Sequence, residues 1–414
     1  MIPKFYNIGI KLYGFAIRIA SIKNQKAKLW IEGRKNTFDY LEQSIVKGEE
    51  LVWIHAPSLG EFEQARPLIE RLKNQHSNYK ILLTFYSPSG YEIRKDYPLA
   101  DYICYLPLDT NQNAKRFVEL VNPKFTFFVK YDFWANYLNE LQKRKHKHYV
   151  ISAIFRSNQF FFKKQGKWML EILSKIDRFF VQNEDSKYML LSRSVKQVTT
   201  TGDTRFDRVI DISKQAKELP LVKLFKQDKP LFIGGSTWPK GEELIVELSK
   251  HYGNRFKYVI APHEICSGQI KKLKKQFNLK VLLYSEVTLQ NIESVDVLII
   301  DNIGLLSSLY SYADLAYIGG GFGKGIHNTL EAATFGMPIF IGPKNEKFQE
   351  AQDLKEIGVV SEIHSAQELI AHCDHLFTRP KKWLEVKEKS KGYVLEKAGA
   401  TIKILNHVFK VAKR

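Results

Sequence analysis

Cysteine is scarce in this 414-residue chain, and its three copies do not form a C-x-x-C pair. A disulfide scaffold and a zinc ribbon are therefore unsupported, and the composition fits a reducing compartment. The chain also lacks long low-complexity segments, which argues against disorder. Its hydrophobic content of 44% and aromatic content of 13% are enough to build buried cores. The length is sufficient for two ordinary domains.

Several nucleotide-site motifs are also missing. The chain has no G-x-x-x-x-G-K-[ST] segment, and its main glycine cluster does not follow G-x-G-x-x-G spacing. A P-loop and a dinucleotide site are therefore not indicated. The absence of D-x-D disfavours a metal-bridged diphosphate donor. We accordingly expect no metal site and no cofactor.

Acidic residues are absent before Glu32, although the whole chain has a formal net charge of +19. Lys4, Lys11 and Arg18 are seven residues apart, so they share one stripe of a predicted helix. Ten apolar residues surround that stripe: Phe5, Tyr6, Ile8, Ile10, Leu12, Tyr13, Phe15, Ile17, Ile19 and Ile22. The pattern predicts a helix in the plane of an anionic membrane surface rather than a spanning helix. The alternative is a helix packed on the protein's own core. No nucleic-acid-binding signature occurs, so no nucleic acid partner is expected.

Apolar runs alternate with helical patterns in two series, which predicts an α/β fold with two doubly wound parallel sheets. The expected strands of the first series are Leu51–His55, Lys80–Phe85, Tyr102–Leu106, Phe125–Val129, Tyr149–Ala153 and Arg178–Gln182. Those of the second are Leu231–Gly235, Lys257–Ala261, Val281–Leu283, Val297–Asp301, Leu315–Gly319 and Pro338–Gly342. The predicted organisation is a membrane-associating helix (1–30), a first Rossmann-like domain (31–210), a linker (211–229), a second Rossmann-like domain (230–385) and a C-terminal helix (386–414).

The most informative segment is the glycine-rich stretch from Tyr317 to Glu331, which follows an apolar run and precedes a helical pattern. Closely approaching backbone amides and a helix N-terminus favour a phosphate-bearing ligand. Asn328 and Glu331 have the spacing of a helix cap, and Glu331 is also placed to accept bonds from ribose hydroxyls. His327 either contacts the phosphate or fills the loop.

Other candidate residues follow the ends of predicted strands, where open α/β sheets bind ligands. Glu61 ends the segment Trp53-Ile-His-Ala-Pro-Ser-Leu-Gly-Glu61 and is placed to act as a general base. Alternatively, Ser58 and Glu61 form a capping box in which the glutamate bonds back to the N-cap amide. Asp132 either binds substrate or caps a helix. Ser236 and Thr237 lie at a strand-to-helix turn that suits a phosphate or a sugar acid.

Taken in order, these segments resemble the Kdo (3-deoxy-D-manno-octulosonic acid) transferase family of lipopolysaccharide assembly. The matching landmarks run from about residue 30 to 350: Trp53 to Glu61, Thr84 to Gly90, Leu106 to Asp109, Trp134, Gly202 to Asp207, Gly235 to Thr237, Gly241-Glu242, Asp301-x-x-Gly304, Gly319 to Glu331 and Gly342-Pro343.

The resemblance implies a GT-B enzyme on the cytoplasmic face of the inner membrane, which transfers Kdo from CMP-Kdo to the lipid A precursor with inversion and without a metal. It implies that Glu61 is the catalytic base. The implied donor-binding residues are Ser236, Thr237, His263, Asn302, Gly304, Gly320, Gly321, Gly325, His327, Asn328 and Glu331. The implied acceptor-binding residues are Ser58, Gly60, Ser87 and Asp132.

The chain departs from the family pattern at several positions. Lys130 stands where an acidic residue is usual, and Pro262 stands where a basic donor contact is usual. Lys344 and Lys347 replace a histidine and an asparagine. These changes either rearrange the donor contacts or supply the missing charge. The alternative functions are another GT-B enzyme, such as a UDP-sugar transferase or a UDP-GlcNAc 2-epimerase, and a non-catalytic glycolipid-binding membrane protein.

Overall fold

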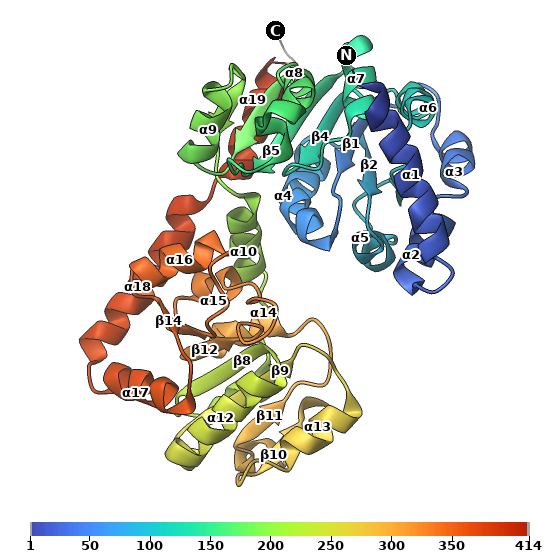
Figure 1. Cartoon of the computed structure of the whole chain (residues 1–414). Coiled ribbons are helices and arrows are strands. Elements are labelled where there is room, and N and C mark those ends of the chain that lie inside the picture. The colour runs from blue at the N-terminus through green and yellow to red at the C-terminus, as the bar shows by residue number, and fades with distance from the viewer. Residues whose placement is uncertain (1, 412–414) are drawn as a thin grey trace. The chain divides into compact units, whose positions relative to one another are not determined.

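The computed structural model describes residues 2–411, which form two compact units (Figure 1). The first unit comprises residues 1–208 together with 398–414, and the second comprises residues 209–397. Each unit has one seven-stranded sheet covered by helices. This pair of parallel α/β domains is the GT-B architecture that the sequence predicts.

The first sheet is wholly parallel, with strand order β3-β2-β1-β4-β5-β6-β7. Its strands are β1 (Leu51–His55), β2 (Lys80–Phe85), β3 (Tyr102–Tyr105), β4 (Phe125–Val129), β5 (Lys147–Ala153), β6 (Arg178–Val181) and β7 (Val198–Thr200). The chain begins at β1, an interior strand, runs to one edge through β2 and β3, and then continues from β4 to the other edge, so the order reverses between β1 and β4. In open sheets this reversal point is where ligands bind, outside the carboxyl ends of the strands.

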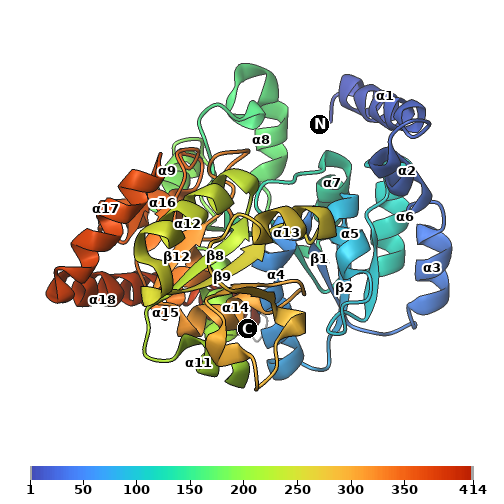
Figure 2. The ribbon, with the colours of Figure 1, turned by 90° about the horizontal axis from the view of Figure 1, so that it is seen from below.

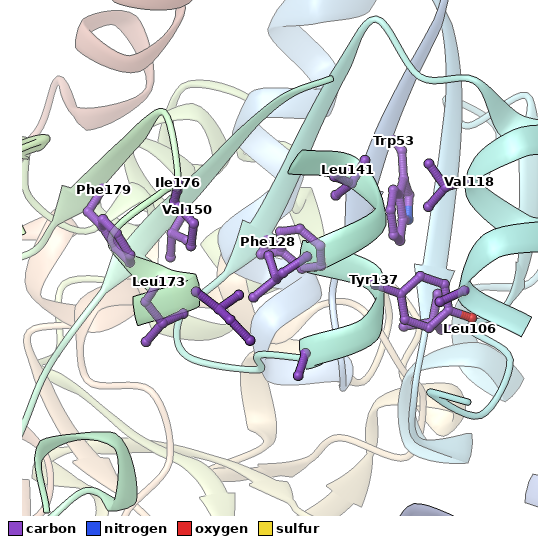
Figure 3. Packing of buried hydrophobic residues seen from close by; sticks show 14 of the residues in the cluster. Trp53, Leu106, Val118, Phe128, Tyr137, Leu141, Val150, Leu173, Ile176 and Phe179 are labelled. Atoms are coloured by element: carbon purple, nitrogen blue, oxygen red, sulfur yellow. The ribbon is translucent and has the colours of Figure 1, made fainter. Parts of the chain in front are cut away.

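Two apolar layers cover the two faces of the first sheet, because alternate residues of a buried strand point to opposite sides. Trp53, Phe128 and Phe179 belong to one layer, which Figure 3 shows with Tyr137 of α7. The helices of this unit are α1 (Lys4–Ala20), α2 (Gln25–Glu32), α3 (Thr37–Ser44), α4 (Leu59–Gln75), α5 (Pro88–Arg94), α6 (Asn111–Val121), α7 (Ala135–Lys143), α8 (Lys167–Leu173), α9 (Glu184–Leu191) and α19 (Ala400–Val411).

The second sheet is also parallel, with strand order β10-β11-β9-β8-β12-β13-β14. Its strands are β8 (Leu231–Thr237), β9 (Lys257–Pro262), β10 (Val281–Leu283), β11 (Val297–Ile299), β12 (Leu315–Ile318), β13 (Ile339–Ile341) and β14 (Val360–Glu362). Its helices are α11 (Pro220–Lys226), α12 (Pro239–Tyr252), α13 (Ser267–Lys274), α14 (Leu306–Leu309), α15 (Leu330–Phe335), α16 (Gln349–Glu356), α17 (Ala366–Phe377) and α18 (Pro380–Lys397). The order reverses between β8 and β12, beside the glycine-rich loop.

The segments expected as a linker and as one C-terminal helix differ in detail. Helix α10 (Thr204–Lys214) and α11 occupy most of residues 211–229, so that segment is largely helical. The C-terminal segment forms two helices, because Gly399 has φ +98° between α18 and α19. Ile404, Leu405 and Val408 of α19 are buried in the core layer that also contains α4. The last helix therefore completes the first unit, where Figure 1 shows it in red.

Helix α1 has two different faces. Its inner face packs on the first unit: Ile10 is buried, and the Tyr6 ring lies 5.2 Å from the Trp168 ring. The outer face is an exposed apolar stripe, and each of its members is between 55% and 62% exposed: Phe5, Ile8, Leu12, Phe15 and Ile19. Within residues 2–411 no helix is both long and apolar enough to cross a bilayer. The alternative interpretation of the sequence, a helix packed on the protein's own core, therefore applies only to the inner face of α1.

Candidate active site

A chain of hydrogen bonds links the carboxyl ends of β1, β2 and β4. Trp53 Nε1 donates to Thr84 Oγ1 at 2.8 Å, and that oxygen lies 2.9 Å from His55 Nδ1. His55 is fully buried, and its Nε2 lies 2.9 Å from Asp132 Oδ2. Trp134 Nε1 donates to the same carboxylate oxygen at 2.8 Å. The Thr84 hydroxyl can accept from the indole and still donate to His55 Nδ1, an arrangement in which His55 Nε2–H donates to Asp132.

Glu61 lies in the first turn of α4, directly beyond the end of β1. Lys130, in the loop after β4, donates to Glu61 Oε1 at 2.9 Å, and the Ser58 hydroxyl donates to Glu61 Oε2. The Ser58 side chain makes no bond to the amides of the helix N-terminus. The predicted capping box is therefore wrong in its geometry, because the carboxylate turns towards two side chains instead of the N-cap amide.

The Glu61 environment keeps this carboxylate ionised. Burial alone would raise its pKa, but the Lys130 ammonium and the Ser58 hydroxyl outweigh burial and lower the pKa below the ordinary glutamate value. The Glu61 side chain is 18% exposed, so it is not sealed in the core. Lys130 itself adopts a left-handed backbone conformation, with φ +62°. An uncommon conformation for a residue with a side chain marks a position where the surroundings impose the geometry.

The other predicted acceptor residues lie on the loops beside this cluster. Gly60 is in the first turn of α4, next to Glu61. Ser87 is the N-cap of α5, and its backbone amide donates to Pro57 O at 2.8 Å. The loops after β1 and β2 are thereby tied together. The first unit thus brings Ser58, Gly60, Glu61 and Ser87 to the loops at one end of the sheet, together with Asp132.

In the second unit, the glycine loop after β12 packs directly against β8. A Cβ atom on Gly319 would lie 2.0 Å from the Ser236 carbonyl oxygen, so only glycine fits there. Gly320 and Gly325 have φ of +94° and +131°, which side chains rarely tolerate. Gly321 lies against Gly342, where an added Cβ would be 2.7 Å from the backbone.

His327 forms a stack with two other rings at the end of this loop. The His263 ring lies 4.3 Å from His327 and 4.8 Å from Trp238. Trp238 Nε1 donates to His327 Nε2 at 3.1 Å. An indole N–H can only donate, so His327 is neutral and carries its proton on Nδ1. Burial and the neighbouring His263 lower the pKa of His327 to about 4. His327 can therefore offer a ligand a neutral N–H donor, but not a positive charge.

A hollow of about 360 Å³ opens beside the ends of β8, β9 and β11. Four of the predicted donor-binding residues line it: Ser236, His263, Asn302 and Gly304. Pro262 lies in the same wall, where the family pattern has a basic residue. The stacking of His263 on His327 joins this hollow to the glycine loop.

Glu331 occupies the first turn of α15, close to the same loop. It accepts bonds from Ser307 Oγ at 2.7 Å and from Asn328 Nδ2 at 3.1 Å. Asn328 Oδ1 in turn accepts from the Leu330 amide. The predicted N-cap role of Asn328 is therefore wrong, because Thr329 is the N-cap of α15 and makes no side-chain cap bond, and Glu331 is bound by side chains instead of by the N-cap amide. Thr237 lies at the other side of the loop and donates to Glu242 at 2.9 Å.

The remaining departures from the pattern lie near the loop after β13. Lys344 and Lys347 are both exposed, and the Lys344 amide donates to Gly321 O at 2.8 Å. Sequence reasoning missed three polar partners in the two sites, namely His55, Ser307 and Trp238. His55 stands inside the best-matching motif, so a polar residue in an otherwise apolar strand was the available signal.

Comparison with known proteins gives a consistent result. Residues 32–208 match the family described as 3-deoxy-D-manno-octulosonic-acid transferase (kdotransferase). The chain is 28% identical over 368 residues to the 3-deoxy-D-manno-octulosonic acid transferase of Aquifex aeolicus, covering 86% of this chain and 95% of that protein. It is 26% identical over 367 residues to the enzyme of the same name from Haemophilus influenzae, covering 86% of each chain.

Solved structures share the fold. The UDP-GlcNAc 2-epimerase of Neisseria meningitidis matches with a TM-score of 0.62 at 18% identity, over 87% of this chain and 100% of that one. A glycosyltransferase from Rickettsia africae matches with a TM-score of 0.57 at 12% identity, over 89% of this chain and 100% of that one. Sequence similarity, in contrast to fold likeness, is with the transferases among these proteins: residues 32–208 match the 3-deoxy-D-manno-octulosonic-acid transferase family, and the two named transferases each align over 86% of this chain.

Proposed function

We propose that this protein transfers Kdo from CMP-Kdo to a lipid A precursor, with Glu61 as the general base. The observation that carries the proposal is the ionised Glu61 carboxylate, held by Lys130 and Ser58 at the end of β1 in a chain of the transferase family. An acceptor hydroxyl needs a base at this type of position, just beyond the carboxyl end of a sheet strand.

The proposed reaction is a single displacement with inversion. The acceptor oxygen forms a bond to C2 of Kdo, while the bond between C2 and the phosphate oxygen breaks and CMP leaves. The hydroxyl proton passes to the Glu61 carboxylate. The lowered pKa of Glu61 has two consequences: the base is fully deprotonated at neutral pH, and it accepts the proton only as the attacking oxygen becomes acidic in the transition state.

The glycine loop and its neighbours are proposed to hold the donor. Backbone amides of Gly320 and Gly321 suit the phosphate of CMP, while the Gly325 amide closes the loop by donating to Gly320 O at 3.2 Å; His327 Nδ1–H adds a neutral donor. Glu331 is proposed to accept from the ribose hydroxyls in addition to Ser307. Ser236, Thr237, His263, Asn302 and Gly304 are proposed to contact the remainder of the donor.

We further propose that α1 holds the protein on the cytoplasmic face of the inner membrane. The outer apolar stripe of α1 supports this, since five large side chains there are more than half exposed. Lys4, Lys11 and Arg18 lie along one edge of the stripe, where they can meet anionic head groups.

A nucleotide panel separates this function from the other GT-B activities. Calorimetric titration with CMP, UDP and GDP should show the tightest binding for CMP. A preference for UDP would contradict the proposal and favour a UDP-sugar transferase or an epimerase. A non-catalytic glycolipid-binding protein would bind the acceptor but fail to turn over CMP-Kdo, which a CMP-release assay measures directly.

A further inference from the structure

A groove of about 470 Å³ runs along the inner edge of α1 in the first unit. Helix α1, helix α2 and the segment from residue 107 to 113 form its walls, and Figure 2 shows α1, α2 and α6 together at one side of this unit. Trp30, Phe38 and Leu108 supply apolar surface inside it. No acidic residue lines the groove.

Arg34 lies at the groove as a half-buried cation without a counter-charge among the described residues. Its guanidinium donates to three backbone carbonyls, at distances of 2.7 to 2.9 Å: those of Leu106, Trp30 and Tyr86. The rings of Trp30, Tyr86 and Tyr105 surround it, and its centre lies 3.7 Å from the Trp30 ring. Within residues 2–411 no carboxylate pairs with it. Burial lowers the pKa of Arg34 to about 10, so it is still charged at neutral pH.

Three further cations line the same groove: Lys11, Arg18 and Lys35. All three are exposed, so they can turn towards a ligand. Phe15 lines the groove and also belongs to the outer apolar stripe of α1. The groove therefore combines four uncompensated positive charges with a direct apolar continuation onto the surface proposed to face the bilayer.

We infer that this groove binds the phosphate head group of an anionic membrane phospholipid, whose acyl chains continue along the outer stripe of α1. Charge complementarity selects the anion, because a lipid phosphate supplies the counter-charge that Arg34 lacks. The apolar floor and the neighbouring stripe select a lipid over a free anion. The inference deepens the membrane contact proposed above and is independent of the transfer chemistry.

The test uses short-chain phosphatidic acid below its micelle concentration, so that binding does not require a membrane. The probe should bind saturably, with one molecule per chain, and more tightly than inorganic phosphate. Replacing Lys11, Arg18 and Lys35 together by Gln should weaken binding by roughly 100-fold, at about fivefold per cation near a phosphate surface. Arg34 is left in place because its bonds hold the backbone.

A matched control removes the same charge from neighbouring positions. Lys23, Lys26 and Lys28 are exposed and do not line the groove, so their joint replacement by Gln should leave probe affinity within about twofold of the parent, a difference well under one kcal/mol. If both triple variants lost the same probe affinity, the effect would come from net charge alone, and the proposed binding site would be refuted. Equal affinity for inorganic phosphate would overturn the lipid assignment. Displacement of the probe by the glycolipid acceptor at a 1:1 ratio would reassign the groove to the acceptor.

Discussion

Removing the Lys130 ammonium tests how Glu61 is tuned. Lys130→Met keeps an unbranched side chain of similar length but removes the charge 2.9 Å from Glu61 Oε1. Lys130→Arg keeps the charge. Position 130 has φ +62°, and both replacements face the same backbone cost there, so differences between them report on the charge.

The magnitude follows from the geometry of the pair. Two unit charges about 3 Å apart attract by roughly 1.4 kcal/mol in bulk water and by roughly 5.5 kcal/mol at an effective dielectric constant of about 20. The two side chains are 27% and 18% exposed, so desolvation and screening offset much of this attraction. We expect Lys130→Met to lower the free energy of unfolding at neutral pH by about 1–2 kcal/mol. Denaturant titration measures this change.

The sign of the pH effect is defined by the lowered Glu61 pKa. The stabilisation that Glu61 gives is complete above the ordinary glutamate pKa and is lost as the pH falls through the lowered value. Without Lys130, burial raises the Glu61 pKa, so the acidic limb of kcat/KM against pH should move to higher pH. Lys130→Arg should leave the limb near its parent position.

Lys124 offers a matched control on the same strand. It pairs with Glu50 at 2.9 Å just before β4, but both members of this pair are about half exposed and lie at the opposite end of the strands from Glu61. Lys124→Met should leave the acidic limb in place and change stability by less than about 1 kcal/mol. An acidic limb that stays fixed in Lys130→Met, with turnover unchanged, would refute the assignment of that limb to Glu61.

Three further predictions follow from the two sites and from α1. Glu61→Gln should lower kcat by roughly 10²–10⁴-fold while leaving CMP affinity unchanged; parental turnover would leave the residue a structural role only. Glu331→Ala should weaken CMP binding by roughly 1.5–3 kcal/mol in calorimetry, and unchanged affinity would restrict Glu331 to its bonds with Ser307 and Asn328. Changing Ile8, Leu12 and Ile19 together to Ser should release the protein from anionic vesicles without unfolding it, because all three side chains are more than half exposed. Undiminished sedimentation with vesicles would place the membrane contact elsewhere.

The strands that are buried on both faces could be predicted from the sequence. Such strands, for example β1 and β4, are continuous apolar runs. The edge strands β7 (Val198–Thr200) and β14 (Val360–Glu362) were missed, because each has three residues and only one of them is buried. Short strands at a sheet edge carry too little hydrophobic pattern to separate them from loops.

In the candidate site, the spacing of residues along the sequence does not predict the side-chain contacts. The spacing of Ser58 and Glu61 predicts a capping box. Instead, the Glu61 carboxylate accepts a hydrogen bond from Lys130, which lies 69 residues later in the chain. The same holds for His327, whose Nε2 accepts a hydrogen bond from Trp238, 89 residues away. Contacts of this kind arise from tertiary packing, so a capping motif or a lone histidine cannot reveal them.

The most direct test of the central claim is transfer itself. The purified protein is incubated with CMP-Kdo and a lipid A precursor in detergent, and the glycolipid product and released CMP are measured together by mass spectrometry and chromatography. We expect a Kdo-extended lipid and CMP in matching amounts per linkage formed, with both reduced in parallel in Glu61→Gln. CMP release without an extended lipid, or equal product from Glu61→Gln, would contradict the central claim.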